Sequence, residues 1–404
     1  MVPKLRFEGF NKNWVVKKLD NVFSFKNGLN ASKEMYGKGV KFINVLDIIN
    51  NEKITFDVIK ESVVATDDQI SSYQVRQGDI LFQRSSETRD EVGQANVYAD
   101  VKTVLFGGFV IRARPLVNIN STFLNFQLKT DALRKDITQR SGGSTRYNIG
   151  QDSLGKVTAF FPEIKEQEKI ANFLSSVDEK ITLLNKQYEL LCMYKKGMIQ
   201  KIFSQKLRFK DENRKEFPKW ETCELKKFLI PTLREVKKPS ESFLSVGIRS
   251  HFKGTFHKDD QDPNKVSVDK LFLVHEGDFI LNITFAWEGA LAIARKEDHL
   301  GYVSHRFPTY TFKKEVITPK FFSYIYTLPK FLTYLDLCSP GGAGRNRVLK
   351  KSEFIEIEID KPCMAEQIKI ANFLSALDDK IDVKKAELDK LKTWKQGLLQ
   401  QMFI

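Results

Sequence analysis

The sequence predicts an α+β protein with an internal repeat, in which two mixed modules are each followed by one long helix. The segment EQEKIANFLSSVDEKI at 166–181 recurs as EQIKIANFLSALDDKI at 366–381, with twelve identical positions. Each copy opens a stretch with heptad spacing of apolar residues and no proline. The region before each copy contains short Val-, Ile- and Phe-rich runs, which are typical of strands. A repeat 200 residues long is too long for a solenoid and indicates two copies of a whole module.

Shorter matches extend the repeat toward the start of each half, while the residues between them differ. This pattern indicates a fixed frame that carries two different inserts, which suits a protein that performs one task on two targets. The matching features are the openings Lys4-Leu5-Arg6-Phe7 and Lys206-Leu207-Arg208-Phe209, Trp14 and Trp220, Gly78-Asp79 and Gly277-Asp278, Pro162 and Pro362, and the glycine loops SGGSTRYN (141–148) and SPGGAGRNR (339–347).

Composition indicates folded domains with a polyanionic partner. A chain of 404 residues with 42% apolar and 12% aromatic content is long enough for two or three domains with proper cores. The net charge of +14 and the pI near 9.3 favour a partner such as nucleic acid. Four cysteines without a C-x-x-C pair indicate neither a zinc site nor a disulfide framework, so we expect a reducing, cytoplasmic setting. We also expect neither a signal peptide nor a membrane span.

We expect residues 1–160 and 209–360 to form the two mixed modules. In each, a predicted helix is followed directly by the glycine loop. The predicted strands of the first module are 41–45, 79–82, 103–111 and 157–161, with a helix at 122–139. The predicted strands of the second are 279–285, 290–294, 309–312 and 354–359, with a helix at 319–337.

Residues 161–208 and 361–404 are each dominated by one long predicted helix. About 38 residues with a 1.5 Å rise give a rod of roughly 57 Å. Both helices place a lysine, Lys195 or Lys395, at an a position of the heptad seam. Either this polar residue fixes register and partner number, or the seam drifts onto the preceding aromatic, Tyr194 or Trp394, because 3.6 does not divide into seven.

Gly197 and Gly397 lie two residues after these lysines, inside the predicted helices. Glycine within a helix costs about 1 kcal/mol relative to alanine. One hypothesis is that a partner packs closely against both glycines, and the alternative is a tolerated glycine near a fraying helix end.

Two variable basic modules with near-identical long helices resemble the specificity subunit of type I restriction–modification systems. The resemblance covers the whole chain and depends most on the paired Glu166-Gln167 and Glu366-Gln367 with the matching residues that follow each pair. Where that family commonly has a proline-rich lead into this pair, the chain has only Pro162 and Pro362.

The resemblance implies two target-recognition domains, 1–160 and 209–360, each of which reads half of a bipartite, asymmetric DNA site. It implies that the helices of the central (161–208) and C-terminal (361–404) conserved regions pack as an antiparallel coiled coil that sets the half-site spacing. It also implies a non-catalytic chain without bound cofactor or metal, assembled with two modification subunits and often with two restriction subunits. Those partners would use S-adenosylmethionine for adenine methylation, and ATP with Mg²⁺.

Polar and basic residues in the variable loops are the candidates for contact with double-stranded DNA, because Arg can bind guanine and Asn or Gln can bind adenine through two hydrogen bonds. For any one of them, a solvated loop or a surface ion pair is the alternative. The candidates are Gln83, Arg84, Ser85, Ser86, Arg89, Ser144, Thr145, Arg146, Tyr147 and Asn148 in the first module, and Asn282, Thr284, Trp287, His305, Arg306, Arg345, Asn346 and Arg347 in the second.

Common enzyme signatures are missing from the sequence, including G-x-G-x-x-G, the P-loop and H-E-x-x-H. Two alternatives to a DNA-recognition subunit remain. The first is an enzyme with an unrecognised nuclease or methyltransferase site, which methyl transfer by the purified chain would reveal. The second is a coiled-coil scaffold with protein-binding modules, which salt-sensitive, sequence-selective binding to duplex DNA would argue against.

Overall fold

The computed structural model describes residues 3–342 and 347–403. The chain divides into two compact units, of which the first comprises residues 1–188 and 383–404 and the second comprises residues 189–382. Each unit therefore holds one module with the start of one long helix and the end of the other.

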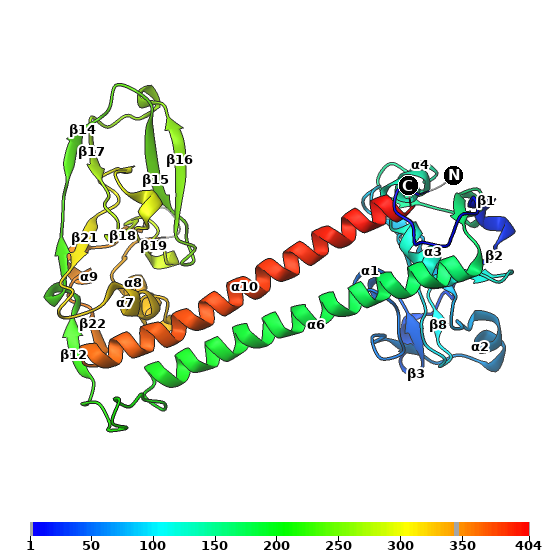
Figure 1. The fold of residues 1–404 in the computed structure, drawn as a ribbon, viewed down its shortest axis with the longest axis horizontal. Helices are drawn as coiled ribbons and strands as arrows, with labels where there is room; N and C mark the ends of the chain where they lie inside the picture. Colours follow the sequence, from blue (N-terminus) through cyan, green and yellow to red (C-terminus); the bar gives the residue numbers. More distant parts are fainter. Residues whose placement is uncertain (1–2, 343–346, 404) are drawn as a thin grey trace. The chain divides into compact units, whose positions relative to one another are not determined.

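The first module is built on a four-stranded antiparallel sheet of order β2-β9-β5-β7 and a three-stranded sheet of order β4-β3-β8 (Figure 1). Two strand pairs, β1 with β11 and β6 with β10, complete its β-structure. Its strands are β1 (Val15–Lys18), β2 (Phe23–Asn27), β3 (Tyr36–Ile43), β4 (Ser62–Val63), β5 (Ile80–Gln83), β6 (Ser85–Ser86), β7 (Ala95–Val97), β8 (Leu105–Phe106), β9 (Val110–Pro115), β10 (Tyr147–Asn148) and β11 (Thr158–Phe161). Its α-helices are α1 (Val45–Ile49), α2 (Asp67–Tyr73), α3 (Ser121–Leu128), α4 (Asp131–Gln139) and α5 (Gln151–Gly155), and short 3-10 turns cover Leu19–Asn21 and Lys33–Met35.

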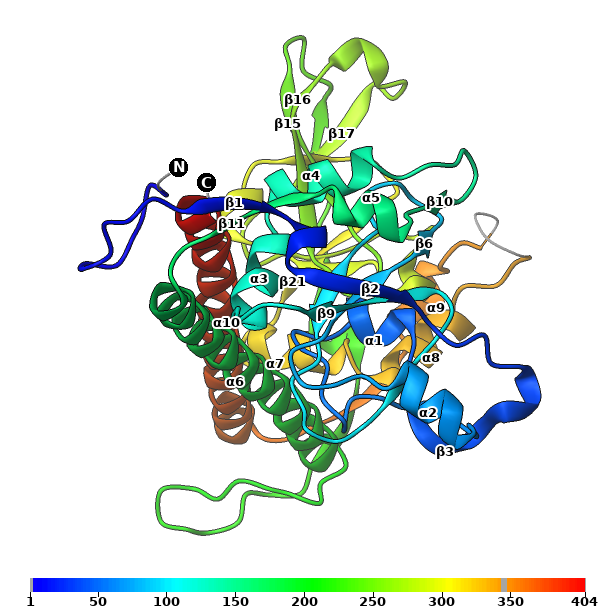
Figure 2. The same cartoon turned by 90° about the vertical axis from the view of Figure 1, so that its right-hand side faces the viewer.

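The second module repeats the same plan with the sheet β13-β21-β18-β19 and the pair β12 with β22. It adds a five-stranded sheet, β14-β17-β20-β15-β16, whose strands β15 to β17 extend away from the helices of this unit (Figure 2). Its strands are β12 (Glu221–Glu224), β13 (Leu229–Pro231), β14 (Glu235–Lys237), β15 (Phe243–Ile248), β16 (Thr255–Gln261), β17 (Lys270–Leu273), β18 (Phe279–Leu281), β19 (Leu291–Ile293), β20 (Tyr302–Val303), β21 (Thr309–Phe312) and β22 (Glu358–Lys361). Its helices are α7 (Pro319–Ile325), α8 (Pro329–Leu337) and α9 (Lys351–Phe354), with 3-10 turns at Leu225–Lys227, Pro263–Lys265, Ala286–Glu288 and Lys296–Asp298.

Two predicted helices are each broken into two. The prediction for 122–139 was wrong because Thr130 adopts an extended conformation and its hydroxyl donates to the Gln127 carbonyl, which ends α3 before α4 starts. The prediction for 319–337 was wrong because Leu328 is extended before Pro329, as expected for a residue that precedes proline.

Three predicted strands also need correction. Residues 103–111 form two strands, β8 and β9, because the chain turns at Gly107-Gly108, where the Gly107 carbonyl lies so close to Gly28 that a side chain on Gly28 has no space. The predicted strand 279–285 ends at Leu281, and 354–359 is the end of α9 followed by β22. The prediction for 354–359 was wrong because a short apolar run does not distinguish a buried strand from a buried helical turn.

The long helices α6 (Ile164–Phe203) and α10 (Met364–Phe403) have 40 residues each. In the first unit, Ile170 and Leu174 near the start of α6 share a core with Leu398 and Met402 near the end of α10. In the second unit, the end of α6 correspondingly packs against the start of α10, through Ile202 and Ile370 among others. Start against end is antiparallel packing, in agreement with the predicted coiled coil. Within the described residues, neither these nor any other helix combines the length and apolar character required to cross a bilayer.

The seam lysines form ion pairs between the two helices. Lys395 pairs with Asp178 in the first unit, and Lys195 pairs with Asp378 in the second. Trp394 and Tyr194 are about half exposed, so the seam does not drift onto the aromatic residues. The structure thus favours the first sequence alternative, in which a polar a position fixes register.

The repeated Glu-Gln pair attaches the first module to α6. Glu166 is fully buried and accepts two hydrogen bonds from Arg6, at 2.6 and 2.7 Å. Gln167 accepts from the backbone N–H of Asn120, the N-cap of α3, and donates to the carbonyl of Pro162. The opening of the module and the start of α3 are therefore both fastened to the first turn of α6.

The second module is attached by the corresponding residues. Glu366 accepts from Arg208 at 3.2 and 2.6 Å, and Gln367 accepts from the N–H of Thr318, the N-cap of α7. The repeated opening of each half thus supplies the arginine that neutralises a buried carboxylate. Without this partner the carboxylate would be costly to bury.

Replacing Glu166 by Gln leaves the Arg6 guanidinium without its counter-ion. Removing one member of a buried pair costs about 3–5 kcal/mol, so we expect the free energy of unfolding of the first unit to fall by about 3 kcal/mol. Urea denaturation followed by circular dichroism measures this, with Glu168→Gln as the control because Glu168 is exposed on the same turn. An equally small effect of both substitutions would show that the buried pair does not anchor the module.

Candidate nucleic-acid interface

The segment after β5 and the glycine loop meet in the first module. Strands β6 and β10 pair antiparallel, with Ser85 opposite Asn148 and Ser86 opposite Tyr147. The N–H of Ile149 donates to the carbonyl of Arg84 at 3.0 Å. Two groups of candidate DNA-binding residues, some 60 positions apart in the sequence, therefore form one continuous surface.

The side chains of these candidates differ in what they offer to a ligand. Gln83 and Ser86 are buried, and they donate to the Ser85 carbonyl and the Glu91 carboxylate, respectively. Both shape the segment after β5, whereas five other candidates have exposed side chains able to reach a duplex. The exposed residues are Arg89, Ser144, Thr145, Arg146 and Asn148, and Arg84 and Tyr147 are partly buried.

The second module builds the same surface from different residues. The N–H of Ile283 donates to the Arg306 carbonyl at 3.0 Å, and the N–H of Leu349 donates to the Ile283 carbonyl at 2.8 Å. The second bond is the counterpart of the one between Ile149 and Arg84. The segment Asn282–Trp287, the exposed pair His305-Arg306 and the chain after the second glycine loop are thereby brought together.

Several candidates in the second module are already engaged within the chain. The Arg347 guanidinium lies over the Trp287 ring at 4.7 Å and donates to the Ser339 carbonyl and the Asp336 carboxylate. Trp287 and the side chain of Asn282 both bond to the backbone of Thr284, which is buried. These contacts support the base of the glycine loop, in which Arg345 and Asn346 lie outside the described residues.

The repeated Gly-Asp pairs place the sheet strand in the same way in both modules. Gly78 has φ +88° and Gly277 has φ +85°, a left-handed conformation that glycine adopts without strain. The following aspartate accepts from the backbone N–H three residues earlier, at 2.8 Å in both cases. In each module this aspartate also pairs with an arginine that sequence reasoning missed. Arg114 pairs with Asp79, and Arg234 pairs with Asp278. These arginines recur at no fixed spacing, so no motif in the sequence indicates them.

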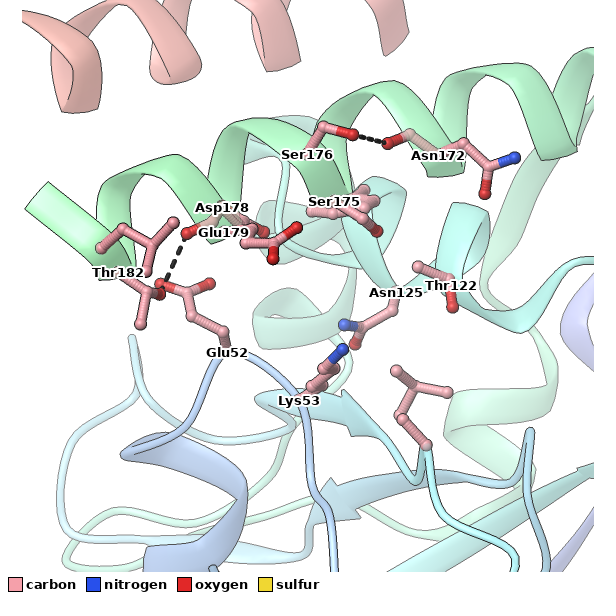
Figure 3. A pocket seen from close by; sticks show the side chains of 14 residues that line it. Glu52, Lys53, Thr122, Asn125, Asn172, Ser175, Ser176, Asp178, Glu179 and Thr182 are labelled. Atoms are coloured by element: carbon pink, nitrogen blue, oxygen red, sulfur yellow. Dashed lines mark hydrogen bonds between the residues drawn. The ribbon is translucent and has the colours of Figure 1, made fainter.

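A cleft of about 760 Å³ separates α6 from the first module (Figure 3). Asn172, Asp178 and Glu179 of α6 line one side, and Glu52 and Lys53 lie on the other. The pKa of Asp178 is raised above its ordinary value, because the effect of burial exceeds the lowering effect of its pair with Lys395. The lining contains neither His nor Cys, and among the described residues no group of three potential metal ligands comes together. The lining of this cleft does not pair a nucleophile with a histidine base.

Comparison with known proteins identifies the family of this chain. The model of the type I restriction modification DNA specificity domain matches residues 11–191 and again 220–393. The chain is 28% identical to the putative type I restriction enzyme MjaX specificity subunit of Methanocaldococcus jannaschii, over 96% of this chain and 92% of that protein. It is 25% identical to the MjaVIII specificity subunit of the same organism, over 69% of this chain and 67% of that protein.

Solved structures share the fold at lower sequence identity. The S subunit of a type I restriction–modification system from M. genitalium superimposes with a TM-score of 0.61 and 17% identity, over 100% of this chain and 99% of that one. A chain from a structure on complex assembly of the type I restriction–modification system gives 0.54 and 13%, over 98% and 99%. With two copies of the specificity domain on the repeated frame described above, the chain belongs to the family of type I restriction–modification DNA specificity subunits.

Proposed function

We propose that each module reads one half of a bipartite, asymmetric DNA site. The observation that carries this proposal is the pair of surfaces built on the same sheet order and the same backbone hydrogen bonds but from different side chains. The exposed candidates include Arg89, Arg146 and Asn148 on the first surface, and His305 and Arg306 on the second. Different side chains at base edges select different bases, so the two half-sites differ in sequence.

The helix pair is proposed to set the distance between the half-sites. A 40-residue helix is about 60 Å long, which exceeds the roughly 34 Å that separate half-sites one duplex turn apart. The ion pairs of Lys195 with Asp378 and of Lys395 with Asp178 hold α6 and α10 in one register, because sliding either helix breaks both pairs. A fixed register gives a fixed spacing.

Inserting one heptad into α6 between Asp178 and Lys195, and a matching heptad into α10 between Asp378 and Lys395, preserves both ion pairs. Seven residues lengthen a helix by about 10.5 Å, or roughly three base pairs. We expect the preferred gap between half-sites to grow by about three base pairs, with both half-site sequences unchanged, as measured by selection from a library of randomised duplexes.

The control inserts the heptad into α6 alone, which breaks the register and should weaken binding to sites of every spacing. If the double insertion changed the half-site sequences, the spacer role would be contradicted. If the unmodified chain showed no selective DNA binding, DNA recognition itself would be contradicted.

The chemistry is proposed to reside in partner subunits. Two modification subunits would methylate adenine with S-adenosylmethionine, and in many systems two restriction subunits would use ATP with Mg²⁺. This chain would supply recognition without a cofactor of its own. A cytoplasmic location follows from the same proposal, because the DNA and the partners are there.

The outer faces of the long helices are proposed to receive the modification subunits. A Cβ atom at Gly197 or at Gly397 would meet no other atom within 4 Å, so nothing in the described chain covers either glycine. Beside Gly197, Met193 and Tyr194 are 69% and 52% exposed, and beside Gly397, Trp394 is 49% exposed. Exposed apolar residues next to a glycine allow the backbone of a partner helix to approach closely.

Gly197→Ala together with Gly397→Ala separates partner binding from folding. We expect the free energy of unfolding to rise by about 1 kcal/mol per site, because alanine is the better helix former, while the complex with the modification subunit weakens at least tenfold. Calorimetric titration measures the second effect, with Ser175→Ala and Ser375→Ala in the same helices as the control. A more stable chain with unchanged complex affinity would contradict this docking face.

A further inference from the structure

A second cavity, of about 450 Å³, lies in the first module beside α4. One wall is the loop that follows α1, and the other is formed by the residues between α3 and α4 and the first turns of α4. The lining residues with side-chain hydrogen-bond donors are Asn50, Asn51, Gln94, Lys129 and Arg134. The lining also includes one carboxylate, that of Glu52, so hydrogen-bond donors outnumber acidic groups in the cavity.

Two of these residues are cations that form no direct ion pair among the described residues, although the Glu52 carboxylate attracts Lys129 and the Asp90 carboxylate attracts Arg134. Arg134 donates from Nη2 to the carbonyls of Asp90 and Val92, at 2.9 and 2.7 Å, and its Nη1 is buried with no acceptor. Lys129 donates from Nζ to the carbonyl of Glu52 at 3.1 Å. Burial lowers the pKa of Lys129 and lowers that of Arg134 to about 10, so the Arg134 guanidinium is still charged at neutral pH. An anion in the cavity would accept from the Nη1 group of Arg134, which has no acceptor within the described chain.

The second module shows that the frame does not need these cations. Helices α4 and α8 have nine residues each, and the helix before each of them starts at an N-cap that donates to the repeated glutamine. The fourth residue is Arg134 in α4 and Leu332 in α8, and the second residue before the helix is Lys129 in one and Thr327 in the other. Because Leu332 packs against the core of its own module, a partly buried arginine at this place is not a requirement of the fold.

The loop that forms the opposite wall is held rigidly. The amide of Asn96, which is fully buried, donates to the carbonyls of Ile48 and Asn51 at 3.1 and 2.6 Å. Asn51 in turn donates to the carbonyl of Asp47 at 2.9 Å. The spacing between the loop and α4 is therefore set by bonds on both sides, as expected for a preformed binding site.

The cavity adjoins the proposed base-reading surface. Asp90 and Val92, whose carbonyls accept from Arg134, lie one and three residues after the candidate Arg89. Arg89 donates from Nε to the carbonyl of Thr138, one turn beyond Arg134 on α4, at 3.2 Å. A duplex that meets Arg89 thus passes within about one helical turn of the cavity.

We propose that this cavity binds a phosphodiester group of the DNA backbone beside the first half-site, through Arg134 and Lys129. The inference rests on the proposed function of the module. Phosphate contacts position a protein on the duplex without reading its sequence. The site therefore contributes affinity and placement to the first half-site, and the corresponding positions of the second module carry Leu332 and Thr327 in place of the two cations.

The test replaces each cation by the residue of the second module, as Arg134→Leu and Lys129→Thr. Each substitution should leave the thermal unfolding midpoint unchanged or higher, because the buried charge is removed. Affinity for the cognate duplex should fall roughly tenfold, equally for variants of the base sequence, and the slope of log K against log salt should become shallower by about 0.9. Lys135→Gln is the matched control, since Lys135 is exposed on the same helix and does not line the cavity.

Unchanged affinity and salt slope in Arg134→Leu would overturn the proposal, as would an equal loss in Lys135→Gln, which would reflect net charge alone. A changed preference for bases in the first half-site would make Arg134 a positioning residue for the loop and would also overturn it. Stabilisation of the chain by inorganic phosphate that Arg134→Leu abolishes, with DNA affinity intact, would assign a free anion instead. If the unaltered chain binds no duplex selectively, the proposed function itself is wrong. Measuring the unaltered chain first therefore separates this outcome from failure of the phosphate site.

Discussion

A buried carboxylate that must be neutralised determines how each module joins its helix. Glu166 and Glu366 lie at the start of the two long helices with no solvent exposure, and each is paired with an arginine from the opening of its own half, Arg6 or Arg208. Burying a charge is costly unless it is paired and hydrogen-bonded. The two halves can therefore differ widely in their inserts and still attach to the frame in the same way. The neighbouring glutamines add neutral bonds to the N-caps of α3 and α7, which fix the orientation of the helix pairs that precede the glycine loops.

The recurring residues and the variable residues have different tasks. The Glu-Gln pair and the Gly-Asp turn are held by interactions within the chain. The exposed residues after the sheet strands and in the glycine loops do not recur. This division explains why one frame can present two unlike surfaces, and why the seam ion pairs occur in both units while the cations of the second cavity occur in only one.

The repeat was the most informative feature of the sequence, since it predicted both long helices, the two modules and the family. The twelve shared positions of the repeated segment include the residues that make the anchor and the seam, Glu166, Gln167 and Asp178 among them. Sequence reasoning failed at two local backbone breaks and at residues whose contacts are long-range. The breaks at Thr130 and Leu328 depend on local backbone geometry, and the commitment of Arg347 to Trp287 and Asp336 depends on a fold that brings three segments together. Arg134 looks like an ordinary surface residue of an amphipathic helix until α4 is placed beside the loop after α1.

Exchanging one module for a copy of the other tests the central claim, that the frame positions either insert independently. In this chimera, residues 209–360 are replaced by the corresponding residues 7–160, with Lys206–Arg208 and both long helices kept. Selection from randomised duplexes should then return an inverted repeat of the first half-site with the original spacing. A chimera that folds but still selects the second half-site, or that selects the first half-site at a different spacing, would contradict the account.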